Sequence, residues 1–184
     1  MKLHLGCWHR HIPGFVHIDL CEGDHIDYKS DIGNLNFIKD STVSYIYCSH
    51  ALEYKDYEDA KEVLREWNRV LKKDGLVRIA VPDFDQLIWL YNETGRDLDK
   101  IIGPLYGKMT INNDTKLYHR TTYNYKKIKN LLESSGFYNI KRYDWRNTEH
   151  SQIDDHSQAY YPHMDKENGT LISLNVEAKK DNGL

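Results

Sequence analysis

The sequence predicts an α/β fold with a mostly parallel sheet of about seven strands, one antiparallel strand near the C-terminus and helices on both faces. Short apolar runs alternate with amphipathic stretches, which is typical of strands joined by helices. The stretch 57–71 has the clearest helical period. The last two expected strands, 137–143 and 171–179, have no helix between them, so we expect one of them to run antiparallel.

The helix expected at 57–71 rests on one apolar stripe with a period of three and four residues. The stripe consists of Ala60, Val63, Leu64, Trp67, Val70 and Leu71. Asp56 can cap the start of this helix, because a carboxylate accepts hydrogen bonds from the first free N–H groups. Lys72 and Lys73 followed by Gly75 are expected to end it.

The remaining elements follow from apolar runs and from breaker residues. Strands are expected at 2–6, 15–20, 24–30, 43–48 and 76–81, and helices at 83–93, 98–106 and 122–135, with 107–122 polar and irregular. The 184 residues predict a single domain spanning 1–184.

The first two strands indicate a nucleoside site. Gly6 ends the first strand and allows close approach of a ligand, and Asp19 ends the second, where a carboxylate can accept both hydroxyls of a ribose. A nicotinamide-binding unit needs three spaced glycines and an acid about 20 residues further on. This chain lacks that triplet, and Asp19 follows Gly6 by only 13 residues. The spacing therefore favours a nucleoside with a short charged tail and disfavours a nicotinamide reductase.

Polar and glycine residues follow four of the expected strands at their carboxyl ends. These residues are Gly6, Asp19, Asp31, Ser49 and His50. Ligands of such sheets bind beyond the carboxyl ends of the strands. We therefore expect these loops to meet at one crevice.

Composition excludes some classes of protein. The net charge of −3 argues against a broad basic surface for nucleic acid, so none is expected as a partner. No apolar run approaches the length of a membrane span. Three cysteines without C-x-x-C spacing, and a strand at the N-terminus, predict reduced thiols in a cytoplasmic protein. The oligomeric state is left open.

Several motifs in order resemble small class I S-adenosylmethionine-dependent methyltransferases. They are Leu5-Gly6-Cys7, Pro13-Gly14-Phe15, Ile18-Asp19, Ser49-His50-Ala51-Leu52-Glu53, Glu66-Trp67-Asn68-Arg69-Val70-Leu71-Lys72 and Arg78-Ile79-Ala80-Val81-Pro82-Asp83-Phe84. The tail is similar to a bacterial subset that is associated with surface polysaccharides, through Tyr143-Asp144-Trp145-Arg146, Thr148-Glu149-His150-Ser151 and Pro162-His163-Met164-Asp165. The resemblance implies a Rossmann-like methyltransferase fold.

The resemblance also implies S-adenosylmethionine as methyl donor and a set of residues that hold it. Gly6 and Cys7 would take the amino-acid tail, Asp19 the ribose, Leu20, Asp31 and Ile32 the adenine, and Cys48 and Ser49 would lie near the sulfonium. His50 is a candidate general base, because the pKa of histidine lies near neutral pH. The alternative for His50 is a histidine packed at a strand–helix junction.

One departure from the family pattern favours a second hypothesis. Family members commonly have glycine where this chain has Trp8, and an indole there must turn away or fill part of the tail pocket. The alternative function is therefore a non-catalytic binding or regulatory module that keeps the fold.

The loop at 144–165 is predicted to be a lid or wall for a small or glycan-linked polar acceptor. Its candidate substrate residues are Arg146, Glu149, His150, Asp154, Asp155 and Tyr160. The alternative is a surface loop bonded only to itself.

No metal is predicted, since methyl transfer from a sulfonium needs none and no H-x-x-x-H or C-x-x-C spacing occurs. Tyr118, His119, Arg120 and Tyr123 form an aromatic and basic cluster, for which we favour a substrate-pocket lining or plain surface over nucleic-acid binding.

Overall fold

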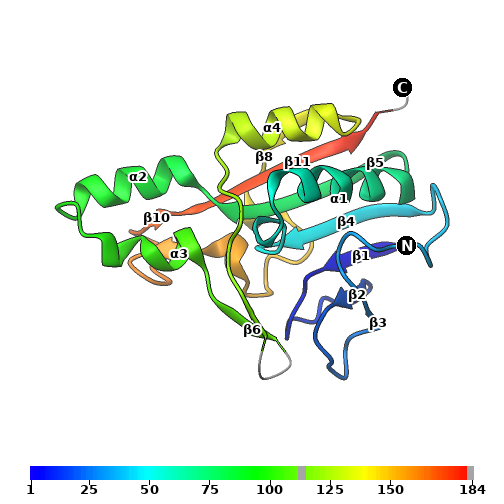
Figure 1. Ribbon diagram of the computed structural model, residues 1–184, viewed down its shortest axis with the longest axis horizontal. Helices are drawn as coiled ribbons and strands as arrows, with labels where there is room; N and C mark the ends of the chain where they lie inside the picture. Colours follow the sequence, from blue (N-terminus) through cyan, green and yellow to red (C-terminus); the bar gives the residue numbers. More distant parts are fainter. Residues whose placement is uncertain (112–114, 182–184) are drawn as a thin grey trace.

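The computed structural model describes residues 1–111 and 115–181. Its main sheet has seven strands in the order β3-β2-β1-β4-β5-β11-β8 (Figure 1). The strands are β1 (Lys2–Leu5), β2 (Val16–Asp19), β3 (Tyr28–Lys29), β4 (Val43–Ser49), β5 (Leu71–Pro82), β8 (Phe137–Arg142) and β11 (Ser173–Lys180). Strand β11 runs antiparallel to both β5 and β8, and the other pairs are parallel. The predicted fold class is confirmed.

Helices and short ladders complete the chain. They are η1 (Leu52–Tyr54), α1 (Tyr57–Val70), α2 (Phe84–Glu93), η2 (Leu98–Lys100), α3 (Ile102–Tyr106), β6 (Met109–Ile111), β7 (Thr115–Leu117), α4 (Tyr125–Ser134), η3 (Trp145–Asn147), η4 (His156–Gln158), β9 (Tyr160–Tyr161) and β10 (Thr170–Leu171). No helix in the described part of the chain is both long and apolar enough to cross a membrane.

Helices α1 and α4 lie along one face of the sheet (Figure 1). Their apolar stripes pack against Leu3, Leu5, Ile46 and Val176, all buried, in one large core. Asp56 caps α1 by accepting a hydrogen bond from Asp59 N–H at 3.0 Å, as the sequence predicts. On this face, apolar helices pack on the sheet, as is usual in α/β folds.

The opposite face of the sheet is polar and aromatic. A row of cross-strand partners runs across five strands through His17, His4, Tyr47, Arg78 and Glu177. Register partners point to the same side of a sheet. The row is therefore one continuous layer on this face.

Short turns and loops cover this layer. Turn η4 packs over β5 and β11. The ring of His150 lies 4.0 Å from that of Tyr47, and the Tyr47 hydroxyl donates to Asp155 Oδ2 at 2.5 Å. Each buried polar atom that finds such a partner avoids a desolvation penalty.

Three local predictions are wrong. Lys72, Lys73 and Gly75 do not end the helix expected at 57–71: it ends at Val70, because Leu71 already pairs with Val43 and begins β5. The third strand covers only Tyr28–Lys29 instead of 24–30, since it is an exposed edge with little apolar surface to bury. The polar stretch after α3 contains the antiparallel pair β6 and β7.

The buried His4 makes stability depend on pH. Burial, with the neighbouring His17 and His150, holds the pKa of His4 well below its usual value, and its Nδ1 has no hydrogen-bond partner within the described residues. The unfolded chain therefore binds a proton that the folded chain does not. As pH falls below about 6.5, the free energy of unfolding should fall by up to about 1.4 kcal/mol per pH unit for this site.

Urea unfolding at about pH 7.5 and pH 5.5 measures this effect. The variant His4→Leu should lose less stability on acidification than the wild-type protein. His163→Leu, at an exposed position, is the matched control and should keep the wild-type dependence. Equal acid sensitivity of the wild-type protein and His4→Leu would contradict the prediction.

Candidate functional site

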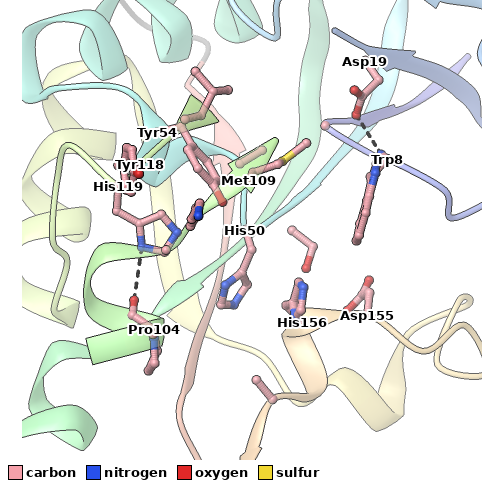
Figure 2. Close-up of a pocket in the computed structure, with 18 of the residues that line it drawn as sticks. Trp8, Asp19, His50, Tyr54, Pro104, Met109, Tyr118, His119, Asp155 and His156 are labelled. Carbon is pink, nitrogen blue, oxygen red and sulfur yellow. Dashed lines mark hydrogen bonds between the residues drawn. The ribbon is translucent and has the colours of Figure 1, made fainter. Parts of the chain in front are cut away.

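A cavity of about 1070 Å³ lies beyond the carboxyl ends of β1, β2 and β4. Figure 2 shows Trp8 and Asp19 on one side of it and Tyr54, Met109 and His119 on the other, with His50 between them. The volume is at the upper end for small-molecule sites, so a nucleoside and a second small molecule can share it. The crevice predicted from the strand ends is present.

Gly6 makes the turn that opens this cavity. It has φ of 64°, a left-handed value that favours glycine, and its N–H donates to Ile18 O at 2.9 Å. A Cβ at this position would lie 2.4 Å from the Cβ of Ala51. The turn after β1 therefore requires glycine, and it presents bare backbone to the cavity.

Asp19 is held rigidly at the end of β2. It is 3% exposed, and its carboxylate accepts from Trp8 N–H at 2.7 Å and from Cys21 N–H at 2.8 Å. Each oxygen keeps a further lone pair, and the residue lines the cavity. The carboxylate is therefore fixed in place and still able to accept hydrogen bonds from a ligand.

The Trp8 indole runs along the cavity wall instead of closing it. The residue has φ of 46°, so the backbone keeps the left-handed turn that glycine commonly provides here. The side chain is 46% exposed, and its ring lies 4.2 Å from that of His9. Its backbone N–H is the group that orients Asp19. The departure from the family pattern thus changes the side chain and preserves the turn.

Leu20, Asp31 and Ile32 also line the cavity. Leu20 is 36% exposed and offers an apolar surface beside Asp19. The two Asp31 oxygens are already bonded, Oδ1 to Gly33 N–H at 2.8 Å and Oδ2 to the Lys55 ammonium at 2.6 Å. This wall is therefore an apolar slot with the ion pair between Asp31 and Lys55 at its edge.

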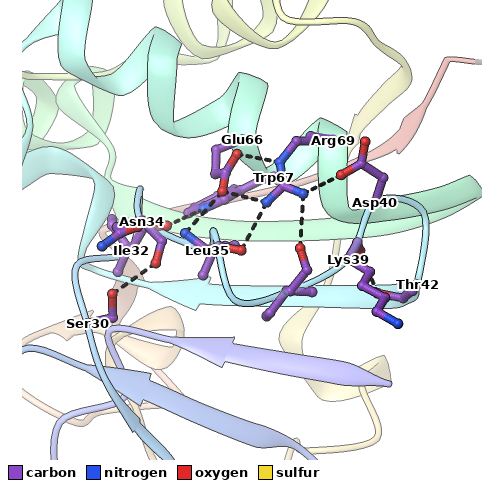
Figure 3. Close-up of polar contacts among 11 residues, drawn as sticks. Ser30, Ile32, Asn34, Leu35, Lys39, Asp40, Thr42, Glu66, Trp67 and Arg69 are labelled. Atoms are coloured by element: carbon purple, nitrogen blue, oxygen red, sulfur yellow. Dashed lines mark hydrogen bonds and ion pairs between the residues drawn. The ribbon is translucent and has the colours of Figure 1, made fainter.

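Hydrogen bonds to α1 fix the loop that carries Ile32 (Figure 3). The Trp67 indole N–H donates to Ile32 O at 2.7 Å. Arg69 donates to Leu35 O at 2.9 Å and to Ile38 O at 3.0 Å, and Glu66 accepts from Leu35 N–H at 3.1 Å. The motif around Trp67 therefore positions one cavity wall from behind.

Two of the predicted donor contacts do not reach the cavity. Cys7 is 2% exposed and Cys48 is fully buried, and neither lines it, because their side chains point into the packed interior. Both thiols, like that of Cys21, are free. Ser49 does line the cavity, and its hydroxyl has no hydrogen-bond partner in the described residues. The Ser49 hydroxyl oxygen is itself buried, so other atoms of the residue form the cavity lining.

His50 sits in a constrained position at the end of β4. Its φ is 52°, uncommon for a residue with a side chain, and its N–H donates to Ala80 O at 2.8 Å. The ring lines the cavity with Nε2 3.1 Å from Ser173 Oγ and Nδ1 3.3 Å from Glu53 Oε1. Both ring nitrogens of the predicted general base are thus occupied by protein groups.

The cavity lining includes Tyr118, His119 and Arg120 of the predicted aromatic and basic cluster, and also His156, which the sequence does not single out for this site. His119 packs edge-on against Tyr54, with ring centroids 4.8 Å apart, and burial lowers its pKa. His156 opens onto the cavity, but the surrounding protein and the nearby His50 lower its pKa to about 4. Both rings are therefore neutral at neutral pH. The sequence gives no signal that His119 packs against Tyr54, because only folding brings the two residues together.

The loop at 144–165 covers the polar sheet face more than it lines the cavity. Arg146, Glu149, His150 and Tyr160 do not line it. Arg146 donates to the Tyr160 hydroxyl at 3.0 Å, Glu149 pairs with Lys2, and His150 is buried on Tyr47. These partners hold the four side chains away from the cavity, so the structure does not bring them to the predicted acceptor site.

The end of the same loop does reach the cavity. Asp154, Asp155 and His156 line it. Asp155 caps η4 through Ser157 N–H at 2.8 Å, and Arg10 donates to Asp154 O at 2.8 Å. Of the loop predicted to be a lid or acceptor wall, the structure thus brings the part that begins at Asp154 to the cavity. In the described residues, no group of three or more His, Cys, Asp or Glu is placed to hold a metal ion.

A family model described as a methyltransferase domain matches residues 17–79. The matched region contains β2, β4, α1 and most of β5, and it includes Asp19, Asp31 and His50. No curated protein matches the chain.

Solved structures share the fold at low sequence identity. A 1,6-didemethyltoxoflavin-N1-methyltransferase from Burkholderia thailandensis, with 1,6-didemethyltoxoflavin and S-adenosylhomocysteine bound, has a TM-score of 0.54 and 12% identity, over 98% of this chain and 71% of that one. A putative S-adenosylmethionine-dependent methyltransferase from Listeria monocytogenes has a TM-score of 0.56 and 15% identity, over 98% and 90%. An S-adenosylmethionine-dependent methyltransferase from Archaeoglobus fulgidus has a TM-score of 0.54 and 17% identity, over 90% of this chain and 76% of that one.

These comparisons confirm the Rossmann-like methyltransferase fold, and the region that carries Asp19 is similar to a methyltransferase domain.

Loss of the Trp67 N–H should weaken the wall that carries Ile32. Trp67→Phe keeps an aromatic ring in the core but leaves Ile32 O without its donor, so we expect a loss of about 1–3 kcal/mol in the free energy of unfolding. The matched control is Trp89→Phe, at a position 44% exposed, which should change stability by less than about 0.5 kcal/mol. Denaturant unfolding of both variants measures the difference, and equal effects would contradict the prediction.

Proposed function

We propose that the protein transfers a methyl group from S-adenosylmethionine to a small polar acceptor, either free or glycan-linked. The observation that carries this proposal is the Asp19 carboxylate, which two backbone N–H groups fix at the rim of a large cavity beside the Gly6 turn. The methyltransferase-domain match over residues 17–79 supports it. The structure with bound S-adenosylhomocysteine, a protein of the same fold, supports the choice of donor.

The cavity wall fits an adenosyl group. The bare backbone at Gly6 leaves room for the amino-acid tail, and the free lone pairs of Asp19 can accept the two ribose hydroxyls. Leu20 and Ile32 provide an apolar slot for the adenine, with Asp31 at its edge.

The methyl donor supplies its own leaving group, since the sulfonium becomes a neutral thioether when the methyl group departs. The protein must therefore orient donor and acceptor in line, exclude water and accept the proton of a hydroxyl or amine acceptor. Rigid residues around the cavity suit the first of these tasks. Asp19 and Gly6 are held by backbone hydrogen bonds, and His50 is held by its backbone and both ring nitrogens.

The wall opposite Asp19 favours a polar acceptor. Tyr54, Tyr118, His119 and His156 line this part of the cavity. Burial raises the pKa of Tyr54 to about 12, so its hydroxyl stays protonated and can donate a hydrogen bond. A small or glycan-linked molecule with several hydroxyl groups would find donors and acceptors here.

The rival function is a binding module that keeps the fold without catalysis. Trp8 motivates it, because an indole occupies the place of a glycine that lies close to the donor in the family pattern. The half-exposed indole leaves the cavity open, which favours the enzyme.

Calorimetric titration with S-adenosylhomocysteine tests the donor site. We expect saturable binding on the order of micromolar Kd. Asp19→Asn should weaken it about 10- to 100-fold, because the ribose loses hydrogen bonds to a charged acceptor. The matched control Asp24→Asn, at an exposed position five residues on, should bind as the wild-type protein does. Circular dichroism confirms that each variant is folded. Equal affinity of Asp19→Asn and wild type would contradict the site.

Trp8→Gly separates the two functions. The substitution removes the indole and keeps the backbone N–H that holds Asp19, so the donor site should bind S-adenosylhomocysteine before and after the change. A wild-type protein that does not bind at millimolar ligand, together with a variant that does, would identify the indole as an obstruction and support the module.

A further inference from the structure

A buried carboxylate lies behind the cavity wall without a hydrogen-bond partner. Glu53 is 0% exposed, and neither of its carboxylate oxygens accepts a hydrogen bond from the described residues. Two histidines that line the cavity face its Oε1, His50 through Nδ1 at 3.3 Å and His119 through Nε2 at 3.7 Å. Burying a carboxylate is unfavourable unless protons or charges compensate it. The positions of the protons in this cluster therefore decide what the cluster does.

Hydrogen bonds fix the proton on His50. Asn175 Nδ2 donates to Ser157 O at 2.8 Å, which turns its Oδ1 towards Ser173. Ser173 Oγ donates to that Oδ1 at 3.0 Å, so it accepts from His50, and Nε2 of His50 carries a hydrogen. Nδ1 then faces Glu53 Oε1 at 3.3 Å. Both nitrogens of His50 therefore face protein groups.

His119 has the opposite arrangement. Its Nδ1 lies 3.1 Å from Pro104 O, and a carbonyl can only accept, so Nδ1 carries the hydrogen. Nε2 is then a lone pair in the neutral ring. It lies beside Glu53 Oε1 at a distance too long for a hydrogen bond.

The site is built closely around this nitrogen. Tyr54 packs on the His119 ring, and a Cβ at Gly107 would lie 2.1 Å from Nε2. Gly107 has φ of 47°, so both its conformation and its lack of a side chain leave room for the ring. The imidazole therefore has a fixed tautomer, a fixed orientation and a neighbouring negative group.

We propose that His119, and not His50, is the general base that takes the proton of the acceptor, and that Glu53 is the positioning residue that stabilises the resulting imidazolium. This inference rests on the proposed methyl transfer. Both nitrogens of His50 face protein groups, whereas Nε2 of His119 carries a lone pair and makes no hydrogen bond within the described residues. Burial lowers the pKa of His119, while Glu53 acts in the opposite direction, so the ring is neutral and ready at neutral pH.

The step balances. The carbon–sulfur bond breaks, and its electron pair stays on sulfur as a neutral thioether. The lone pair of the acceptor oxygen or nitrogen forms the new bond to the methyl carbon. The proton of that atom passes to His119 Nε2, so the positive charge of the sulfonium is replaced by that of the imidazolium beside Glu53. Release of this proton to solvent resets the site.

Long-range ¹H–¹⁵N NMR of the ¹⁵N-labelled protein tests the proposal, because it reports the tautomer and the titration of each histidine. At neutral pH we expect His119 with hydrogen on Nδ1 only and His50 with hydrogen on Nε2. S-adenosylmethionine and S-adenosylhomocysteine differ by the methyl group and its charge. If His119 faces that methyl group, the sulfonium should move its titration to lower pH by on the order of one unit relative to S-adenosylhomocysteine.

Variants assign the effect to the cluster. Glu53→Gln should move the titration of His119 to lower pH, because it removes the neighbouring negative charge. Gly107→Ala should displace the ring and change its signals, whereas Gly103→Ala, where an added Cβ meets nothing within 4 Å, should leave them unchanged. The titration of the exposed His11 should be the same with both ligands and in every variant.

The outcomes separate the two proposals. Failure of both ligands to bind by calorimetry overturns the methyl transfer and this inference with it. Binding without a difference in the titration of His119 overturns only this inference, as does a His119 with hydrogen on Nε2 or a His50 with a free nitrogen. Stoichiometric binding of Zn²⁺ or Mn²⁺ that is lost in Glu53→Gln would also overturn it, since the three groups would then be metal ligands.

Discussion

The site depends on the hydrogen bond from Trp8 N–H to the Asp19 carboxylate. This bond joins the turns after β1 and β2, two parallel neighbours, and a second N–H from Cys21 completes the clamp. A carboxylate with two backbone donors has one orientation, and each of its oxygens keeps a further lone pair for a ligand. The strained left-handed backbone at Trp8 is therefore part of the binding geometry.

The polar face of the sheet explains how a chain of this size encloses so large a cavity. The row from His17 to Glu177 binds the loop 144–159 through side chains such as Tyr47, instead of burying an apolar helix. This anchoring brings Asp154 to His156 to the carboxyl ends of the strands. Polar contacts between the sheet and this loop thus hold the cavity wall that Asp154 to His156 form.

The sequence predicts those parts of the fold and site that depend on local pattern. Alternating apolar runs predict the sheet, and Gly6 and Asp19 lie where strand ends meet. Gly75 does not end the helix as its position suggests, because Leu71 pairs with Val43, and local propensity does not include this contact. The sequence does not predict that His150 is buried against Tyr47, because the two residues lie about a hundred residues apart in the chain. The cluster that contains His119 is expected at a pocket, but its contact with Glu53 is not, because the two residues meet only after the strands and the segment before α4 have packed.

A crystal structure of the protein with S-adenosylhomocysteine tests the central claim most directly, because it locates the sugar relative to the clamp. The account predicts both ribose hydroxyls within hydrogen-bond distance of the Asp19 oxygens, with the Trp8 N–H bond intact and the indole beside the ligand. A ligand bound elsewhere, or an indole lying in the space of the ribose with the carboxylate turned away, would contradict it.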